Sequence, residues 1–535
     1  MDGGPYKRII RVISQILIKI SQLAQESSLD RKRQIVGLIF GPICALLVYS
    51  LPIAGLAGNP EAHKLLAIVT FVAFWWICEP VPIPVTSLLA PVLCIIFGVA
   101  SATDAFSAFA NPMIFLFMGG FLIAKGMMVN GLDKRIAYGI MSMKWVGDSP
   151  RRIFLAIGLA CMICSGWISN TATAAMMFPI ALGLLEAIRE MMAANGKEID
   201  LKNYKYATGL MLMTAYACSI GGVLTPVGTP PNIIMIGFLK ELAPESPQIS
   251  FFSWMTWGFI AMALFFVITY FVLLKMFPSD VKHIDGAQKF IQERKQSLGK
   301  WTRAQKNTLI AFIIAVVLWV FPGILGAIQN FAPDAIDAGF IKAYNSHFPE
   351  AIAAMVGGLL MFLLPTDIKK GEMTMSWKDG VSGIDWGTLL LFGGGLSIGG
   401  MTFSTGLSQW IGESLTEALG GQPSEYLFLT LFAVTALLLS ELTSNTAVAN
   451  LMGPIAIATA VSLGFSPLPV CVVMALCTSL AFMLPVSTPP NAIVYASGYI
   501  PITKMVKAGV VLDLICVFAI SVPVVYFVVK AIMGI

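Results

Sequence analysis

Long apolar runs, separated by short polar stretches, follow one another along almost the whole chain. They lie at residues 34–56, 65–79, 83–101, 112–131, 152–168, 172–188, 206–239, 251–277, 306–330, 350–365, 386–411, 426–443, 447–464, 468–499 and 507–533. A helix needs about 20 mainly apolar residues to cross the hydrocarbon core of a bilayer. Several runs reach that length without a charge, so the pattern predicts an all-α polytopic membrane protein.

Two pairs of short runs each surround the polar tripeptide Ser-Asn-Thr, and no charged loop separates the members of a pair. The first pair covers residues 152–188 and the second covers residues 426–464. Polar residues at membrane depth are tolerated where the backbone lines a cavity rather than lipid. We therefore predict that each pair is a re-entrant hairpin with Ser-Asn-Thr at its tip.

These tripeptides belong to an internal repeat. Residues 169–181 and 444–456 match at nine of thirteen positions, and "PVGTPPNII" from Pro226 matches "PVSTPPNAI" from Pro485 at seven of nine. A looser pair is "MGGFLIAKGM" at 118–127 and "FGGGLSIGGM" at 392–401. The three pairs keep the same order. They predict two halves, 34–276 and 306–535, joined by a cytoplasmic linker at 277–305, with broken helices at 206–239 and 468–499.

The distribution of charge orients this arrangement. Lys and Arg concentrate in cytoplasmic loops of membrane proteins. With a cytoplasmic N-terminus and re-entrant hairpins, most basic residues fall inside, the loop at 282–306 above all, and the outside loops hold mostly acids. The C-terminus is then outside, and residues 1–33 read as an amphipathic helix on the membrane surface. The two halves enter from opposite sides, which makes the repeat inverted and typical of secondary transporters with a site at the midplane.

Composition narrows the function classes. The chain is 57% hydrophobic and 12% charged, whereas soluble domains carry about 25% charged residues. The nine cysteines, Cys161 and Cys164 of a CxxC included, lie in apolar segments and are interpreted as packing residues, and the three histidines fall in loops or at helix ends. HExxH does not occur, and the GxSxG match at residues 395–399 is accompanied by no histidine within an apolar run that could act as its base. An intramembrane enzyme, an organic cofactor and a nucleic-acid partner are therefore disfavoured, and no signalling domain supports a membrane sensor.

The repeated motifs have a chemistry of their own. Paired prolines remove backbone donors and interrupt a helix, and the carbonyls that are freed can coordinate a hard cation such as Na+. A Ser-Asn-Thr tip directs a helix N-terminus, with its free N–H groups, at an anion. Neither motif contains Arg or Lys, so bound cations would have to balance the anion's charge. This is the logic of cation-coupled symport of a small anion with two charged ends.

Four other polar residues of the apolar runs are harder to interpret. Glu441 precedes the second tip by three residues and is interpreted as structural. Lys125 and Asp513 lie near predicted helix ends, where they are expected to snorkel toward the interface. Glu79, in "CEPVPIP", is expected to shape the turn between two helices.

With these motifs, and with "LLLFGGGLSIGGM", the chain resembles the divalent anion/sodium symporter family over roughly residues 34–533. The resemblance implies a homodimer with eleven transmembrane helices and two re-entrant hairpins per protomer, and elevator-type transport in a bacterial-type cytoplasmic membrane. It implies Na+-coupled uptake of C4-dicarboxylates such as succinate, malate and fumarate. The partners would be the dicarboxylate, Na+, membrane lipid and a second copy of the chain. A citrate or sulfate carrier and a sodium-independent exchanger are the alternatives.

The family also implies particular site residues. Sodium would be held at one site by Ser165, Ser169, Asn170 and Gly228, and at a second by Ser440, Ser444, Asn445 and Ser487. The substrate would meet Ser169, Asn170, Thr171, Thr229, Pro230, Ser444, Asn445, Thr446, Thr488 and Pro489. Ser165 and Ser440 each lie four residues before their tripeptide, so the repeat supports that pair independently. No catalytic residue is expected.

Overall fold

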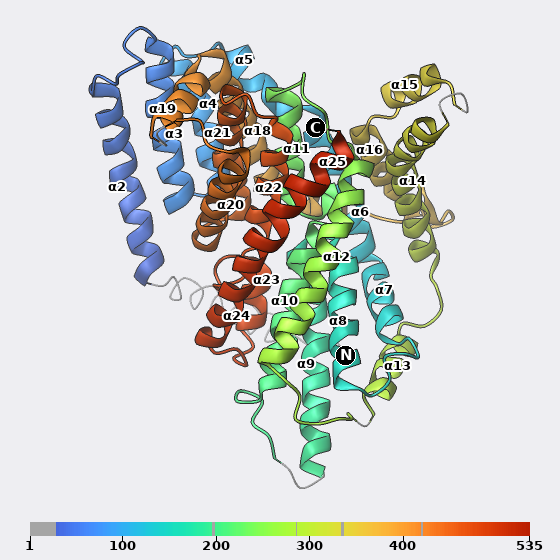
Figure 1. Ribbon diagram of the computed structural model, residues 1–535. Helices are drawn as coiled ribbons and strands as arrows, with labels where there is room; N and C mark the ends of the chain where they lie inside the picture. The colour runs from blue at the N-terminus through green and yellow to red at the C-terminus, as the bar shows by residue number, and fades with distance from the viewer. Residues whose placement is uncertain (1–27, 195–197, 285, 333–335, 419–420, 535) are drawn as a thin grey trace, which may run out of the picture.

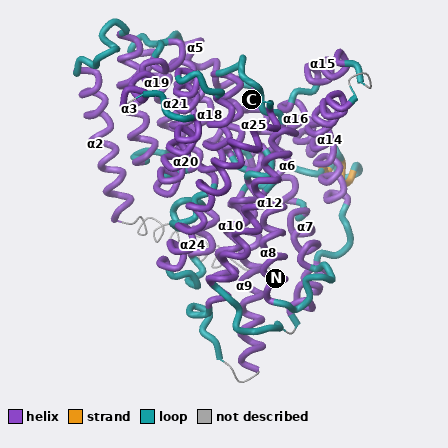
Figure 2. Tube along the Cα trace, viewed as in Figure 1, coloured by secondary structure: helices purple, strands orange, loops and turns teal. Residues whose placement is uncertain are grey.

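The computed structural model describes residues 28–194, 198–284, 286–332, 336–418 and 421–534. The amphipathic helix predicted within 1–33 lies almost entirely outside the described residues. Most of the described chain is helical (Figure 2), and its one strand pair is β1 (Pro365–Asp367) with β2 (Glu372–Met373). The predicted all-α polytopic fold is confirmed.

The first half of the chain runs from α2 to α12. Its elements are α2 (Ser28–Ser50), α3 (Pro60–Cys78), α4 (Ile83–Ile96), α5 (Ala102–Ser107), η1 (Ala108–Ala110), α6 (Pro112–Val129), α7 (Leu132–Met141), α8 (Pro150–Ser165), α9 (Asn170–Ala194), α10 (Lys205–Gly222), η2 (Pro226–Gly228), α11 (Pro230–Leu242) and α12 (Phe251–Met276). Several begin with a proline, whose missing N–H costs nothing in the first helical turn.

The second half runs from α14 to the end. It consists of α14 (Arg303–Phe331), α15 (Ala338–His347), α16 (Glu350–Leu363), α17 (Trp377–Gly383), α18 (Trp386–Ser404), α19 (Leu407–Ala418), α20 (Glu425–Leu442), α21 (Asn445–Ser462), α22 (Pro467–Ser479), α23 (Pro489–Tyr495), α24 (Ile502–Ile515), the π-helices η3 (Cys516–Ser521) and η4 (Val524–Val529), and α25 (Lys530–Met533). Between the halves, the predicted linker contains a helix, α13 (Ala287–Ser297), that the sequence pattern missed.

Nine helices of the described chain are long and apolar enough to span a membrane, or ten if α15 and α16, which meet at 52°, form one span. The count includes one arm of each predicted hairpin, α9 and α20. It omits the two broken helices. The second break leaves two short pieces, α22 with 13 residues and α23 with 7. The first leaves α11 with 13 residues and α10 with 18, and α10 is not among the spans that are apolar enough. The breaks therefore lie where the sequence places them, and the re-entrant path of the hairpins stays a prediction.

In Figure 1 the helices α2, α3 and α4 lie beside α18–α21, the helices α14–α16 lie on the opposite side, and α8, α10, α12 and α22 lie between them. The glycines of the loosest repeat pair bring helices close together. A Cβ on Gly119 of α6 would overlap Ala354 of α16, and one on Gly394 of α18 would overlap the Ser87 backbone of α4. Small residues at such crossings let helix backbones approach inside a membrane.

Candidate functional site

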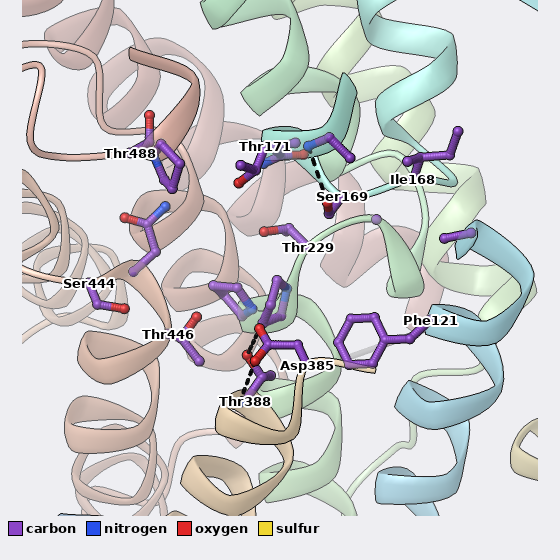
Figure 3. A pocket seen from close by; sticks show the side chains of 18 of the residues that line it. Phe121, Ile168, Ser169, Thr171, Thr229, Asp385, Thr388, Ser444, Thr446 and Thr488 are labelled. Carbon is purple, nitrogen blue, oxygen red and sulfur yellow. Dashed lines mark hydrogen bonds between the residues drawn. The ribbon is translucent and has the colours of Figure 1, made fainter. Parts of the chain in front are cut away.

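Both tips and both helix breaks meet at one cavity of about 650 Å³. Ligand pockets typically have volumes of about 300–1,000 Å³. All ten residues predicted to contact the substrate line it: Ser169, Asn170, Thr171, Thr229, Pro230, Ser444, Asn445, Thr446, Thr488 and Pro489. Figure 3 shows Thr171, Thr229, Ser444, Thr446 and Thr488 around the same space. Segments up to about 320 residues apart in the chain thus contribute polar groups to one cavity.

The first tip is a short loop between α8 and α9. The Ser165 hydroxyl donates to Asn170 Oδ1 over 2.6 Å, and Ser169 Oγ accepts from the Ala172 N–H at 3.3 Å. Ser165 is fully buried, whereas Ser169 and Thr171 are exposed to the cavity. Ser169 therefore caps α9, and the first N–H groups of that helix lie at the cavity.

The first helix break is closed by one asparagine side chain. Asn232 Nδ2, on the residue after the paired prolines, donates to the carbonyls of Gly222 (3.0 Å) and Thr225 (2.9 Å). The Thr225 hydroxyl in turn donates to the Gly166 carbonyl at the tip, over 2.5 Å. Breaking a helix leaves carbonyls without intrahelical partners, and Asn232 satisfies two of them. Its position is part of the repeated motif, but its role was not anticipated.

Several neutral oxygens lie around Gly228. A Cβ built on this glycine would lie 2.5 Å from the Gly222 oxygen and 3.0 Å from the Gly166 oxygen, and one on Gly222 would overlap the Asn170 amide. Carbonyl, amide and hydroxyl oxygens are the ligands that hard cations prefer. The four residues of the first predicted sodium site therefore lie in one neighbourhood. Whatever binds there is held by neutral groups, and among the described residues no group of three His, Cys, Asp or Glu side chains could hold a metal.

The second tip repeats the first. Ser440 Oγ lies 3.1 Å from Asn445 Oδ1 and 2.8 Å from the Thr478 carbonyl, within hydrogen-bonding distance of both. Ser440 is fully buried, as Ser165 is. Ser444 and Asn445 line the cavity beside Thr446.

The second break is also closed by an asparagine. Asn491 Nδ2 donates to the Ala481 carbonyl (3.3 Å) and the Leu484 carbonyl (3.1 Å). Thr488 Oγ1 lies on the cavity wall, is buried, and has no hydrogen-bond partner in the described chain. Ser487 differs from its repeat partner Gly228, because its hydroxyl donates to the Glu441 carboxylate. The second break therefore presents the unpaired Thr488 hydroxyl to the cavity, and the Ser487 hydroxyl bonds it to the Glu441 carboxylate.

Four charged residues also line the cavity, and the motif analysis did not assign them to the site: Arg33, Glu79, Lys125 and Asp385. Arg33 donates to the Leu442 carbonyl at the second tip (3.2 Å) and lies 3.8 Å from the Glu79 carboxylate. Asp385 accepts from the Thr388 hydroxyl and N–H and so caps α18 (Figure 3). Lys125 makes no ion pair or hydrogen bond with a described residue, and its stem packs over Gly383. The expectation that Lys125 snorkels toward the interface did not include a place on the cavity wall.

Three interpretations of single residues can now be compared with the structure. Glu79 does shape the turn after α3, where it has a left-handed backbone with φ of 49°. Glu441 has structural contacts, since it accepts from the N–H groups of Met483 (2.9 Å) and Leu484 (3.1 Å) at the second break. The interpretation of Asp513 was wrong: the residue is only 4% exposed, because this face of α24 packs against the second break, where a Cβ on Gly509 would overlap the Met483 backbone. The nine cysteines are free and all but Cys44 are buried, which confirms their packing role.

Comparisons with known proteins agree with this architecture. Residues 32–532 match the family described as the sodium:sulfate symporter transmembrane region. The sodium-dependent dicarboxylate transporter SdcS of Staphylococcus saprophyticus is 33% identical over 524 residues, which cover 98% of this chain and 96% of that protein. SdcS of Staphylococcus aureus strain NCTC 8325 is 33% identical over 513 residues, or 94% and 92% of the two chains.

Two solved structures have a similar fold. The YdaH transporter of Alcanivorax borkumensis has a TM-score of 0.52 and 13% identity, over 80% of this chain and 87% of that chain. MtrF of Neisseria gonorrhoeae has the same TM-score and identity, over 91% and 98%. At this identity the likeness concerns the fold alone.

Proposed function

We propose that this chain, which belongs to the sodium:sulfate symporter family, is a secondary transporter that couples Na+ entry to the uptake of C4-dicarboxylates. It is an integral membrane protein and not an enzyme. The observation that carries the proposal is the convergence of two Ser-Asn-Thr tips and two proline breaks on one cavity. The sodium-dependent dicarboxylate transporters of Staphylococcus, each 33% identical, support the choice of ion and substrate.

The chemistry of the two edges suits a dianion. Each tip presents hydroxyl and amide groups together with a helix N-terminus, and such N-termini bind carboxylates. One carboxylate would meet Ser169, Asn170 and Thr171, and the other would meet Ser444, Asn445 and Thr446. The Thr229–Pro230 and Thr488–Pro489 pairs would form the walls between them.

Sodium would balance this charge from behind the tips. In the first half Ser165, Asn170 and the carbonyls around Gly228 would hold one Na+, and in the second half Ser440, Asn445 and Ser487 would hold another. Each ion would share an asparagine with the substrate, so that ion and anion bind together. This sharing is the physical basis of coupling, because either ligand orders the tip that the other needs.

The movement that carries the site across the membrane is part of the same proposal. The repeated motifs, predicted to enter from opposite faces, favour an inverted repeat that moves as an elevator against a fixed part of a homodimer. Alternating access around a site between inverted repeats is the common mechanism of such transporters.

Uptake of radiolabelled succinate into proteoliposomes tests the proposal. An inward Na+ gradient should drive accumulation, and an equal K+ gradient should not. Asn170→Ala and Asn445→Ala should each abolish sodium-driven uptake, whereas Asn203→Ala, an exposed loop asparagine, should leave it intact. Sodium-driven uptake that survives both substitutions in well-folded protein would contradict the site.

A sodium-independent dicarboxylate exchanger is the second candidate. Arg33 and Lys125 line the cavity, and a fixed basic side chain can take the place of a bound cation. In that case uptake would be equal in Na+ and K+ and would require dicarboxylate inside the vesicles. If succinate is not taken up under either condition, sulfate and citrate become the substrates to test.

A further inference from the structure

Asp513 is a carboxyl group in an apolar span without a partner of opposite charge. It belongs to α24, within the candidate span Ile502–Met533, and the residue is 4% exposed. Both of its oxygens are buried, and its polar neighbours are the Phe482 N–H and the Glu441 side chain. No described Lys, Arg or His forms a salt bridge with it. An ionisable residue inside a membrane is costly and usually functional.

The neighbour of Asp513 makes its position more costly still. The Glu441 carboxylate faces Asp513 and accepts three hydrogen bonds, from the N–H groups of Met483 and Leu484 and from the Ser487 hydroxyl. These donors satisfy the Glu441 oxygens, but all of them are uncharged, so none neutralises the pair of acids that Glu441 forms with Asp513.

Helix packing holds the two acids together. A Cβ on Gly509 would overlap the Met483 backbone, so α24 lies directly against the second break. Asp513 follows Gly509 by four residues and shares its face of the helix. The other titratable groups that face this position are Tyr216 of α10, Cys516 of η3 and, beyond it, Cys477 of α22. The Tyr216 hydroxyl donates to the Phe482 carbonyl over 2.8 Å. Tyrosine and cysteine side chains cannot carry a positive charge, so none of these groups can neutralise the acids.

We infer that Asp513, beside Glu441, binds one further monovalent cation, Na+ or a proton, which enters and leaves with the substrate. The inference rests on the proposed function, because it adds a coupled ion to that transport cycle. A bound cation lowers the cost of burying two carboxyl groups side by side. Either Na+ or a proton could neutralise a carboxyl group here. During uptake the first would bring an additional sodium ion into the vesicle, and the second would bring in a proton.

The repeat indicates why this cation is additional to the two at the tips. With the offset of 275 residues, the counterpart of Glu441 is Gly166. The first half therefore has no side chain at the position where the second half has a carboxylate. Glu441 also accepts a hydrogen bond from Ser487, a residue of the second predicted sodium site. Glu441 therefore lies between Asp513 and that site. Binding at the two places is expected to be cooperative.

Asp513→Asn tests the inference, because it removes the charge and keeps the shape. Initial uptake of ²²Na+ and ¹⁴C-succinate is measured in the same proteoliposomes, with a pH dye in the lumen to report proton entry. Asp104→Asn, at an exposed acid of α5, is the matched control. Wild type should carry one cation more per succinate than Asp513→Asn: a higher ²²Na+ ratio if the cation is sodium, or proton entry lost in the variant if it is a proton.

Equal sodium and proton ratios in wild type and Asp513→Asn would overturn the inference. If the variant transports too slowly, the same comparison is made at equilibrium, from the Na+ and pH dependence of the stabilisation that succinate gives the purified protein. A shallower dependence in Asp513→Asn supports the site, and an unchanged one refutes it. Failure of wild type to show any sodium-driven uptake would instead refute the proposed function, so the two failures are distinguishable.

Discussion

Replacing Asn232 by alanine removes the side chain that holds the first helix break together. The amide donates to the carbonyls of Gly222 and Thr225 at 3.0 and 2.9 Å, and the residue is fully buried. A buried carbonyl left without its donor costs about 1–3 kcal/mol. Thr225 keeps a weaker bond from the Gly228 N–H at 3.3 Å, so its loss is at the low end of that range. The sum is about 2–4 kcal/mol, which lowers the ratio of folded to unfolded protein roughly 30-fold or more.

The expected loss can be measured by equilibrium unfolding of the purified protein in a detergent–SDS titration, followed by tryptophan fluorescence. Asn491→Ala removes the equivalent side chain, whose bonds are longer at 3.3 and 3.1 Å, and should cost less. Asn203→Ala, in an exposed loop, controls for the loss of any asparagine. If Asn232→Ala unfolds at the same SDS fraction as wild type, the amide does not satisfy the break, and the explanation of the repeated "PPN" fails.

Two further predictions concern the cavity. Gly228→Ala should weaken Na+ activation of uptake at least about tenfold, the equivalent of about 1.4 kcal/mol, because its Cβ would lie 2.5 Å from the Gly222 oxygen. Gly139→Ala, in α7, is the control and should change it little, because nothing lies within 4 Å of its Cβ. An unaffected Gly228→Ala would contradict the first sodium site. Lys125→Gln should raise the KM for succinate several-fold at low ionic strength and much less in high salt at constant Na+, because screening shortens the Debye length from about 10 Å at 0.1 M to about 3 Å at 1 M. If the rise in KM is the same at low and high ionic strength, Lys125 contacts the substrate directly.

The repeat predicted the parts of the site that both halves contain. Ser165 and Ser440 each lie beneath the asparagine of their own tip, and Thr229 and Thr488 each form part of the wall. Two occurrences in the same order identify such positions, because a structural accident would not recur with the same neighbours. Even Asn232 and Asn491 could have been found in this way. Their role is not visible in the pattern, because the prolines beside them already account for the break and only the structure shows which carbonyls the asparagines satisfy.

The charged residues of the cavity could not be predicted by that logic, since none of them is repeated. With the offset of 274 residues that relates "MGGFLIAKGM" to "FGGGLSIGGM", the counterpart of Lys125 is Gly399. Arg33, Glu79 and Asp385 lie outside all three motif pairs and reach the cavity only through helix packing. The repeated part of the cavity is therefore neutral, and its charges come from the parts that differ between the halves. A dianion would meet two equivalent edges once it is bound, but it would approach them past groups of both signs that only one half supplies. Symmetry thus accounts for how the cavity could hold its substrate, and the departures from symmetry must account for the order in which ions and substrate enter and leave.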